Sequence, residues 1–348
     1  MTHLWVRAEQ RDHEQRVGLM PDGAKALIEK GIRVTVEDSA SRAIPIDGYR
    51  AAGCDIAPEG SWPDAPADAI VFGLKELPEA NSPLIHRHIM FGHAYKGQPD
   101  GRMLLDRFKL GGGKLYDLEY LTDETGRRVA AFGYWAGFAG AAVALKCWAA
   151  QQRGSICGPV GVYPSSDALK ADLSKELDAT GQPRPSALVI GALGRVGTGA
   201  SDLCAAMGVE TTKWDMAETA HGGPFPEVLQ HEIFLNCILA NPGCPVFVPR
   251  SAVTADRRLT VIGDIACDPT SDFSPIKVYN RATTWEDPAT RTAGRPPLDV
   301  TAIDNLPSLL PAESSEDYAA QLLPSLLTLD ALDSGVWARA KAEFDKHA

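Results

Sequence analysis

The feature that most constrains the fold is an apolar stretch that runs directly into a series of glycines. In "ALVIGALGRVGTGA", residues 187–200, an apolar run leads to Gly191, Gly194, Gly197 and Gly199, and a helical pattern follows. Glycines permit the tight turn and leave the positive end of the helix open to an anion. This unit, spaced G-x-x-G-x-x-G, predicts a dinucleotide-binding turn in a parallel sheet covered by helices.

The next predicted strand, "ETTKWD", ends on an acid. Asp215 lies 24 residues after Gly191, close to where an acid binds the ribose hydroxyls of NAD. An acid at this place disfavours the additional phosphate of NADP. The alternative is that Asp215 only caps a turn. The strand, the glycines, the helix and the acid together favour NAD as the cofactor.

Strand-like and helix-like segments alternate in the rest of the chain as well. The first third has a strand pattern over 3–9, a helical pattern over 21–31 and a strand pattern over 32–38, and apolar runs recur at 68–75 and 87–95. Similar short apolar runs follow the glycine turn. The pattern predicts an α/β fold with two doubly wound sheets, and 348 residues are enough for two domains.

Composition excludes several classes of protein. The net charge of −11, from 45 acidic and 34 basic residues, argues against a large nucleic-acid-binding face. The longest apolar run, residues 135–145, is too short to cross a membrane. The charges scattered through residues 1–21 are not those of a secretory signal, so we expect a cytoplasmic protein. Seven scattered cysteines without a C-x-x-C pair indicate reduced thiols and no metal site.

Two candidate catalytic residues directly follow apolar runs. Lys75 comes after "IVFGL" and His93 comes after "IMFG". In parallel sheets, ligands bind beyond the carboxyl ends of the strands. A lysine partly removed from water has a lowered pKa and can act as a general base, and histidine suits acid-base work near neutral pH. Glu76 and Glu119 are possible counter-charges that would oppose the lowering of the Lys75 pKa.

Further cations recur at turns or strand ends, namely Arg16, Lys96, Arg127 and Arg128. Taken singly, each is better explained as a solvated surface charge. Together they predict a substrate with carboxylates, because paired guanidinium groups bind carboxylates through two hydrogen bonds.

Ten segments, in order and over nearly the whole chain, resemble a known family. They are "RAEQRDHEQRVGLMP", "VFGLKELPE", "FGHAYK", "LYDLEYL", "GRRVAAFGYWAGFAGAA", "VIGALGRVGTGA", "KWD", "HGGPF", "NCIL" and "IDNLPSLLPAESSEDY". The family is that of the NAD-dependent, lysine-forming saccharopine dehydrogenases, within the wider alanine dehydrogenase and transhydrogenase group.

The resemblance implies two Rossmann-like domains with an active-site cleft between them. Residues 1–135 plus 322–348 would form the substrate domain, and residues 136–321 would bind NAD. It also implies an oxidoreductase reaction with small-molecule partners: saccharopine loses hydride to NAD, and the resulting imine is hydrolysed to lysine and 2-oxoglutarate. We expect a monomer, with at most weak self-association.

The resemblance also assigns roles to residues. Lys75 would deprotonate the substrate amine, and His93 would serve as acid and base in hydrolysis. Substrate contacts would come from Arg16, Lys96, Arg128 and Phe132. Cofactor contacts would come from Arg127, Gly191, Gly194, Arg195, Val196, Gly197, Asp215, His221, Ile265, Ile303, Asp304, Asn305 and Leu306.

The chain departs from the family at two of these positions. Fungal members carry a cysteine in the glycine turn that pairs with one on the strand matching "NCIL", whereas here the turn has Val196, so Cys237 is expected to lack that partner. His221 stands where an arginine often contacts the cofactor.

Two other functions stay open: an alanine dehydrogenase or other opine-type dehydrogenase, and a binding protein that senses NAD or lysine without turnover.

Overall fold

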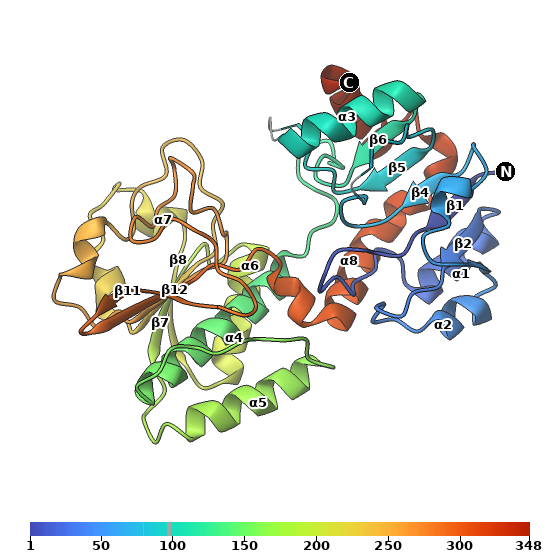
Figure 1. Ribbon diagram of the computed structural model, residues 1–348. Helices are drawn as coiled ribbons and strands as arrows, with labels where there is room; N and C mark the ends of the chain where they lie inside the picture. Colours follow the sequence, from blue (N-terminus) through green and yellow to red (C-terminus); the bar gives the residue numbers. More distant parts are fainter. Residues whose placement is uncertain (79, 96–98) are drawn as a thin grey trace. The chain divides into compact units, whose positions relative to one another are not determined.

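The computed structural model describes residues 1–78, 80–95 and 99–348. The chain forms two compact units: residues 1–131 with 311–348, and residues 132–310. Over the described residues, each unit contains one six-stranded sheet with helices (Figure 1). The predicted class, α/β with two doubly wound Rossmann-like units, is therefore confirmed.

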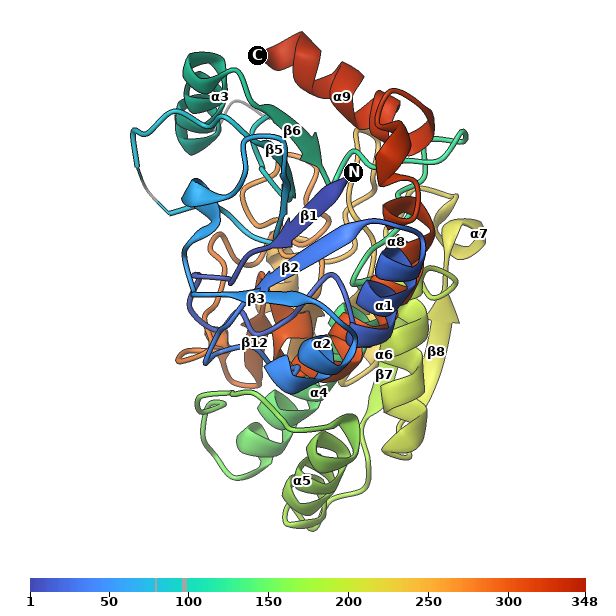
Figure 2. The ribbon, with the colours of Figure 1, turned by 90° about the vertical axis from the view of Figure 1, so that its right-hand side faces the viewer.

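The first unit has a wholly parallel sheet with the strand order β3-β2-β1-β4-β5-β6. Figure 2 shows β1, β2 and β3 side by side. The elements of the unit are β1 (His3–Val6), α1 (Pro21–Glu29), β2 (Arg33–Glu37), α2 (Ile46–Ala51), β3 (Asp55–Ala57), η1 (Trp62–Asp64), β4 (Ile70–Phe72), β5 (Arg87–Met90), α3 (Pro99–Gly111), β6 (Lys114–Asp117), α8 (Pro311–Leu326), η5 (Leu329–Ala331) and α9 (Gly335–His347).

Local sequence explains where these elements begin and end. Helix α1 starts at Pro21, whose fixed φ suits the first helical turn, and the chain leaves it through Gly31 at a φ of +89°. Strand β4 is buried along its whole length, as expected for a central parallel strand.

The second unit has the strand order β11-β12-β10-β9-β7-β8. Its edge strand β11 pairs antiparallel with β12. The sequence had predicted a parallel sheet, whereas the sheet in the structure is only mostly parallel. A short β11–β12 hairpin at the edge needs no crossover helix, which explains the exception. The elements are α4 (Gly133–Gln152), α5 (Ser166–Asp178), β7 (Ser186–Ile190), α6 (Arg195–Ala206), β8 (Glu210–Trp214), α7 (Met216–Thr219), η2 (Pro226–Gln230), β9 (Ile233–Asn236), η3 (Arg250–Val253), β10 (Val261–Asp264), β11 (Thr290–Gly294), β12 (Pro297–Thr301) and η4 (Leu306–Leu309).

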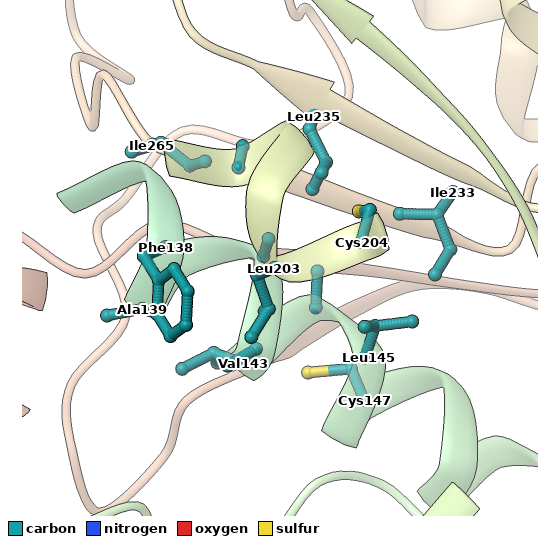
Figure 3. Close-up of a cluster of buried hydrophobic side chains, with 14 of the residues drawn as sticks. Phe138, Ala139, Val143, Leu145, Cys147, Leu203, Cys204, Ile233, Leu235 and Ile265 are labelled. Carbon is teal, nitrogen blue, oxygen red and sulfur yellow. The ribbon is translucent and has the colours of Figure 1, made fainter. Parts of the chain in front are cut away.

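Helix α4 forms the centre of the second unit's core. It is buried from Gly137 to Ala150 and packs with α6 and β9 in the cluster of Figure 3. Gly137 and Gly199 allow the two helices to touch, because a Cβ at Gly137 would lie 1.8 Å from the Val196 carbonyl oxygen. Although α4 is apolar, no helix of the described chain has the length and hydropathy needed to cross a membrane.

The unit boundaries differ from the expected ones. The first unit ends at Ala131, not at residue 135, because α4 packs in the second unit from its first turn. The chain returns to the first unit at Pro311, not at residue 322. Helix α8 contacts α1, and its Ser315 hydroxyl accepts a hydrogen bond from the Val17 N–H at 2.9 Å, so the whole helix stays with the first unit.

Candidate active site

The first sheet places both predicted catalytic residues at one edge. The strand order reverses direction between β1 and β4, which is where ligands bind in open parallel sheets. Lys75 follows β4, and His93 follows the neighbouring strand β5. The structure therefore brings the Lys75 and His93 segments to the carboxyl ends of adjacent parallel strands.

Lys75 is half-buried and acts electrostatically on a buried ion pair. Arg16 Nε and Nη2 donate to the two carboxylate oxygens of Glu14 at 2.8 and 2.6 Å. Burial alone would raise the pKa of Glu14, but the hydrogen bonds and charge of Arg16, together with the charge of Lys75, lower it below its usual value. Glu14 thus interacts both with Lys75, the predicted base, and with Arg16, the arginine predicted to bind carboxylates. The sequence analysis did not identify Glu14 as a candidate residue.

His93 lies in an unusual main-chain conformation. Its φ is +47°, a left-handed value that histidine adopts more readily than bulky residues do. Its Nδ1 lies 3.9 Å from Glu119 Oε2, and Glu119 Oε1 lies 3.6 Å from Arg128 Nη2. The His93 ring stacks on Phe91. Glu119, predicted as a counter-charge for Lys75, is therefore placed between His93 and Arg128.

A second carboxylate missed by the sequence prediction organises the His93 segment. Asp117 is buried at the end of β6 and accepts hydrogen bonds from the N–H groups of Glu119 at 2.9 Å and Gly92 at 3.2 Å. Burial raises the pKa of Asp117 to about 6, despite these hydrogen bonds. The signal in the sequence was an acid that ends an apolar strand, the same signal that identified Asp215.

The remaining predicted residues of the first unit have other surroundings. Glu76 is exposed and lies 3.4 Å from Arg11. Arg127 is exposed in a turn where its N–H donates to Asp123 at 3.0 Å. Lys96 lies outside the described residues. Phe132 directly precedes α4 and is the first residue of the second unit.

The glycine turn has the shape expected of a phosphate-binding turn. Gly191 has a φ of +87°, and a Cβ at Gly197 would lie 2.1 Å from the Gly191 carbonyl oxygen, so the turn requires both glycines. Gly194 differs, because a Cβ there would meet nothing closer than 3.5 Å. Since Gly194 is the N-cap residue of α6, its missing side chain leaves the helix N-terminus open to an anion. These residues fit a dinucleotide pyrophosphate.

Asp215 links the end of β8 to this turn. Its Oδ2 accepts a hydrogen bond from the Leu193 N–H at 3.0 Å, and its Oδ1 accepts one from the Met216 N–H at 2.9 Å. It also forms a capping box with Glu218. The two interpretations of Asp215 are therefore compatible, because it caps α7 and lies beside the glycine turn.

The other predicted cofactor residues follow the strands of the second sheet or lie near them. Ile265 and Leu306 pack together over Gly140 of α4, and Asn305 Oδ1 accepts a hydrogen bond from Trp285 Nε1 at 2.8 Å. Ile303 is buried and Asp304 exposed. Exposed Arg195 and half-buried Val196 form the first turn of α6, and exposed His221 packs against Phe225.

Cys237 follows β9 as a free, buried thiol, and burial raises its pKa. The part of the chain that the structure describes has no group of three or more histidine, cysteine or acidic side chains arranged to hold a metal ion.

Solved structures show where this fold occurs. An L-alanine dehydrogenase superposes with a TM-score of 0.70 over 100% of both chains at 18% identity. A transhydrogenase from Sinorhizobium meliloti superposes with a TM-score of 0.65 over 97% of both chains at 16% identity. At such low identity, these similarities establish the fold alone.

Sequence comparison identifies the family. Residues 5–139 match the model described as "Alanine dehydrogenase/PNT, N-terminal domain". The chain is 45% identical to a protein of Candida albicans and 47% identical to one of Neurospora crassa, over 99% of this chain and 96% of each relative. A Schizosaccharomyces pombe protein is 44% identical over 99% of this chain and 97% of its own length. All three are named saccharopine dehydrogenase [NAD(+), L-lysine-forming], and the chain belongs to this family.

Proposed function

We propose that the protein oxidises saccharopine with NAD to give L-lysine and 2-oxoglutarate, in a reversible reaction. The observation that carries the proposal is the identity of 44–47% to lysine-forming saccharopine dehydrogenases over nearly the full length. Lys75, His93 and the glycine turn lie at the carboxyl ends of strands, where such a reaction needs them.

We assign the proton transfers to the first unit. Lys75 takes the proton from the secondary amine of saccharopine, because hydride leaves the adjacent carbon only when the nitrogen lone pair is available. NAD supplies the hydride acceptor when it is bound. His93, which neighbours Glu119, then carries protons to and from the water that hydrolyses the imine. Arg16, Arg128 and Lys96, with Phe132, bind the substrate, the cations pairing with its carboxylates.

We assign NAD binding to the second unit. The open N-terminus of α6 and the turn at Gly191 and Gly197 suit the pyrophosphate. Asp215 beside the turn suits the ribose hydroxyls and favours NAD over NADP. Arg127, Arg195, Val196, His221, Ile265 and residues 303–306 complete the proposed set of cofactor contacts.

We further propose that the enzyme is a cytoplasmic monomer that acts on small molecules and not on nucleic acid. Its seven thiols are free, which suits a reducing compartment.

The activity is tested by mixing the protein with NADH, lysine and 2-oxoglutarate and following NADH absorbance. We expect oxidation of NADH that requires both lysine and 2-oxoglutarate. Oxidation with pyruvate and ammonia instead would identify an alanine dehydrogenase. Binding of NADH or lysine without oxidation under either condition would identify a sensor.

A further inference from the structure

Lys75 lies beyond the end of β4, where bonds to the β5 side reach only as far as Leu74, so side chains must complete the bonding of this segment. Strand β4 ends at Phe72, and Gly73, Leu74 and Lys75 continue beyond it. Main-chain polar groups at such places need partners. The partners of Leu74 and Lys75 therefore show what fixes the segment.

Glu9 binds the two N–H groups of the segment. Its Oε1 accepts a hydrogen bond from the Leu74 N–H at 2.6 Å, and its Oε2 accepts one from the Lys75 N–H at 3.0 Å. A single carboxylate thus bridges two consecutive residues. Hydrogen bonds to a charged acceptor are stronger than those between neutral groups.

Arg7 binds the carbonyl side of the same segment. Its Nη2 donates to the Lys75 carbonyl oxygen, while its Nη1 donates to the Ala8 carbonyl oxygen at 3.1 Å and lies 3.4 Å from Glu9 Oε2. Gly73 provides the space for this guanidinium, because a Cβ at Gly73 would lie 2.4 Å from Arg7 Nε. The Arg7 guanidinium therefore fills the space that a side chain at position 73 would need.

The Arg7–Glu9 pair is buried, with side chains 1% and 8% exposed. Of the four main-chain polar groups of Leu74 and Lys75, three bond to these two side chains, and the Leu74 carbonyl accepts from the Phe91 N–H at 2.9 Å. A buried ion pair contributes little net stability, because desolvation offsets its attraction. Its effect here is to define one main-chain conformation.

We propose that Arg7 and Glu9 are positioning residues for Lys75. They fix the main chain at residues 74–75 and thereby the point from which the amine reaches the substrate. The inference rests on the proposed role of Lys75 as the base.

The test is a double-mutant cycle between Glu9→Gln and Lys75→Met. Glutamine keeps the shape of Glu9 but replaces one acceptor by an N–H donor that faces another N–H. We expect kcat for saccharopine oxidation to fall about 10- to 100-fold, as for a misplaced catalytic group. We expect KM and the NADH affinity to change little. In the Lys75→Met background, Glu9→Gln should lower kcat by less than about twofold, because residues that act as a unit are not additive.

Glu9→Gln also leaves the buried Arg7 charge without its counter-charge, and this could unfold the protein. A second variant, in which both charges remain, therefore separates a loss of positioning from a loss of folding. Arg7→Lys keeps the positive charge beside Glu9 but lacks the planar fork that reaches two carbonyl groups. It should show the same selective fall in kcat and the same non-additivity with Lys75→Met, at nearly unchanged melting temperature.

A matched control is Glu232→Gln. Glu232 also accepts a strand N–H, that of Ser186 at 2.8 Å, and pairs with Arg258, but it lies directly before β9 and bonds to the first residue of β7, at the opposite end of that strand from the glycine turn. Its replacement should leave kcat unchanged. Multiplicative losses in the Lys75→Met background, or wild-type kcat in Glu9→Gln and Arg7→Lys, would overturn the positioning role. Wild-type kcat in Lys75→Met alone would instead overturn the proposed function of Lys75.

Discussion

At the carboxyl ends of their strands, the two units share one sheet geometry but present different chemical groups. In the second unit, the edge at β7 is made of main chain, with glycines and a helix N-terminus within residues 191–197. In the first unit, the edge at β1 and β4 is made of charged side chains from segments far apart; the buried Arg7, for example, bonds to the carbonyl of the half-buried Lys75, 68 residues distant.

The difference suits the function that we propose for each edge. A pyrophosphate is a permanent anion, and fixed N–H groups and a helix dipole bind it without any titrating group. Proton transfer needs side chains that titrate, and their pKa values and positions depend on neighbouring charges. Glu14, Asp117 and Glu119 are three such neighbours among the described residues of the first unit.

The largest effect expected concerns the base. Replacing Lys75 by Met should lower kcat by about 10²- to 10⁴-fold, the usual effect of losing a general base, while NADH binding stays nearly intact. Steady-state kinetics and NADH fluorescence titration measure both. Lys25→Met, on the exposed face of α1, is the control and should keep full activity. An equal loss of NADH affinity in Lys75→Met would show a structural role and weaken the contrast between the units.

Substitutions at two glycines of the turn distinguish an effect on folding from an effect on ligand binding. Gly197→Ala forces a Cβ to 2.1 Å from a main-chain oxygen, so we expect the free energy of unfolding to fall by about 1–3 kcal/mol or more, with loss of NADH binding. Gly194→Ala, with no clash, should cost less than about 1 kcal/mol but still weaken NADH binding. Urea unfolding and NADH titration test this, and unchanged NADH affinity in Gly194→Ala would contradict a pyrophosphate site at the helix end.

The first unit should also be the one whose stability depends on pH through a buried histidine. His88 is buried, and neither ring nitrogen has a hydrogen-bond partner within the described residues. Burial first, then the charges of Arg7, His86 and Arg107, hold its pKa well below the usual value. The unfolded chain gains this proton below about pH 6.5 and the folded chain does not, so stability falls as pH drops, by up to about 1.4 kcal/mol per pH unit.

Asp117 acts in the opposite direction, because its raised pKa makes the folded chain bind the proton more tightly at pH values up to about 6. The His88 contribution is therefore measured as the difference between wild type and His88→Met in urea unfolding at several pH values. We expect wild type to lose about 2 kcal/mol more than the variant between neutral pH and pH 5. A difference that does not change with pH would disprove the assignment.

The smallest effect expected is on cofactor preference. If Asp215 binds the ribose as we propose, Asp215→Asn removes the charge that disfavours the phosphate of NADP, so the ratio of kcat/KM for NADPH over NADH should rise. Loss of part of the cap should cost less than about 1 kcal/mol of stability. Glu218→Gln is the control, because Glu218 accepts the Asp215 N–H at 2.7 Å in the same capping box. A rise of the same size in Glu218→Gln would attribute the effect to the helix cap.

The sequence alone determined the features that depend on neighbouring residues. The β-α-β alternation, the glycine turn and the placement of Lys75 and His93 beyond strand ends all follow from patterns within about a dozen residues. The strand ends also predicted that these two residues share one end of the sheet, and the structure places them just beyond the ends of two adjacent strands. Similarity over the whole chain gave the family, which the comparisons confirmed.

Only the tertiary structure decided which charges meet. The pairing of Glu119 with His93, the bond from the Gly92 N–H to Asp117 and the bonds of Arg7 and Glu9 to the Lys75 segment join residues that strand order brings together. Local sequence cannot specify these contacts, because a charge at a turn is equally stable in solvent. Burial between strands 25 to 68 residues apart determines its partner, and with it the pKa and the orientation on which the chemistry depends.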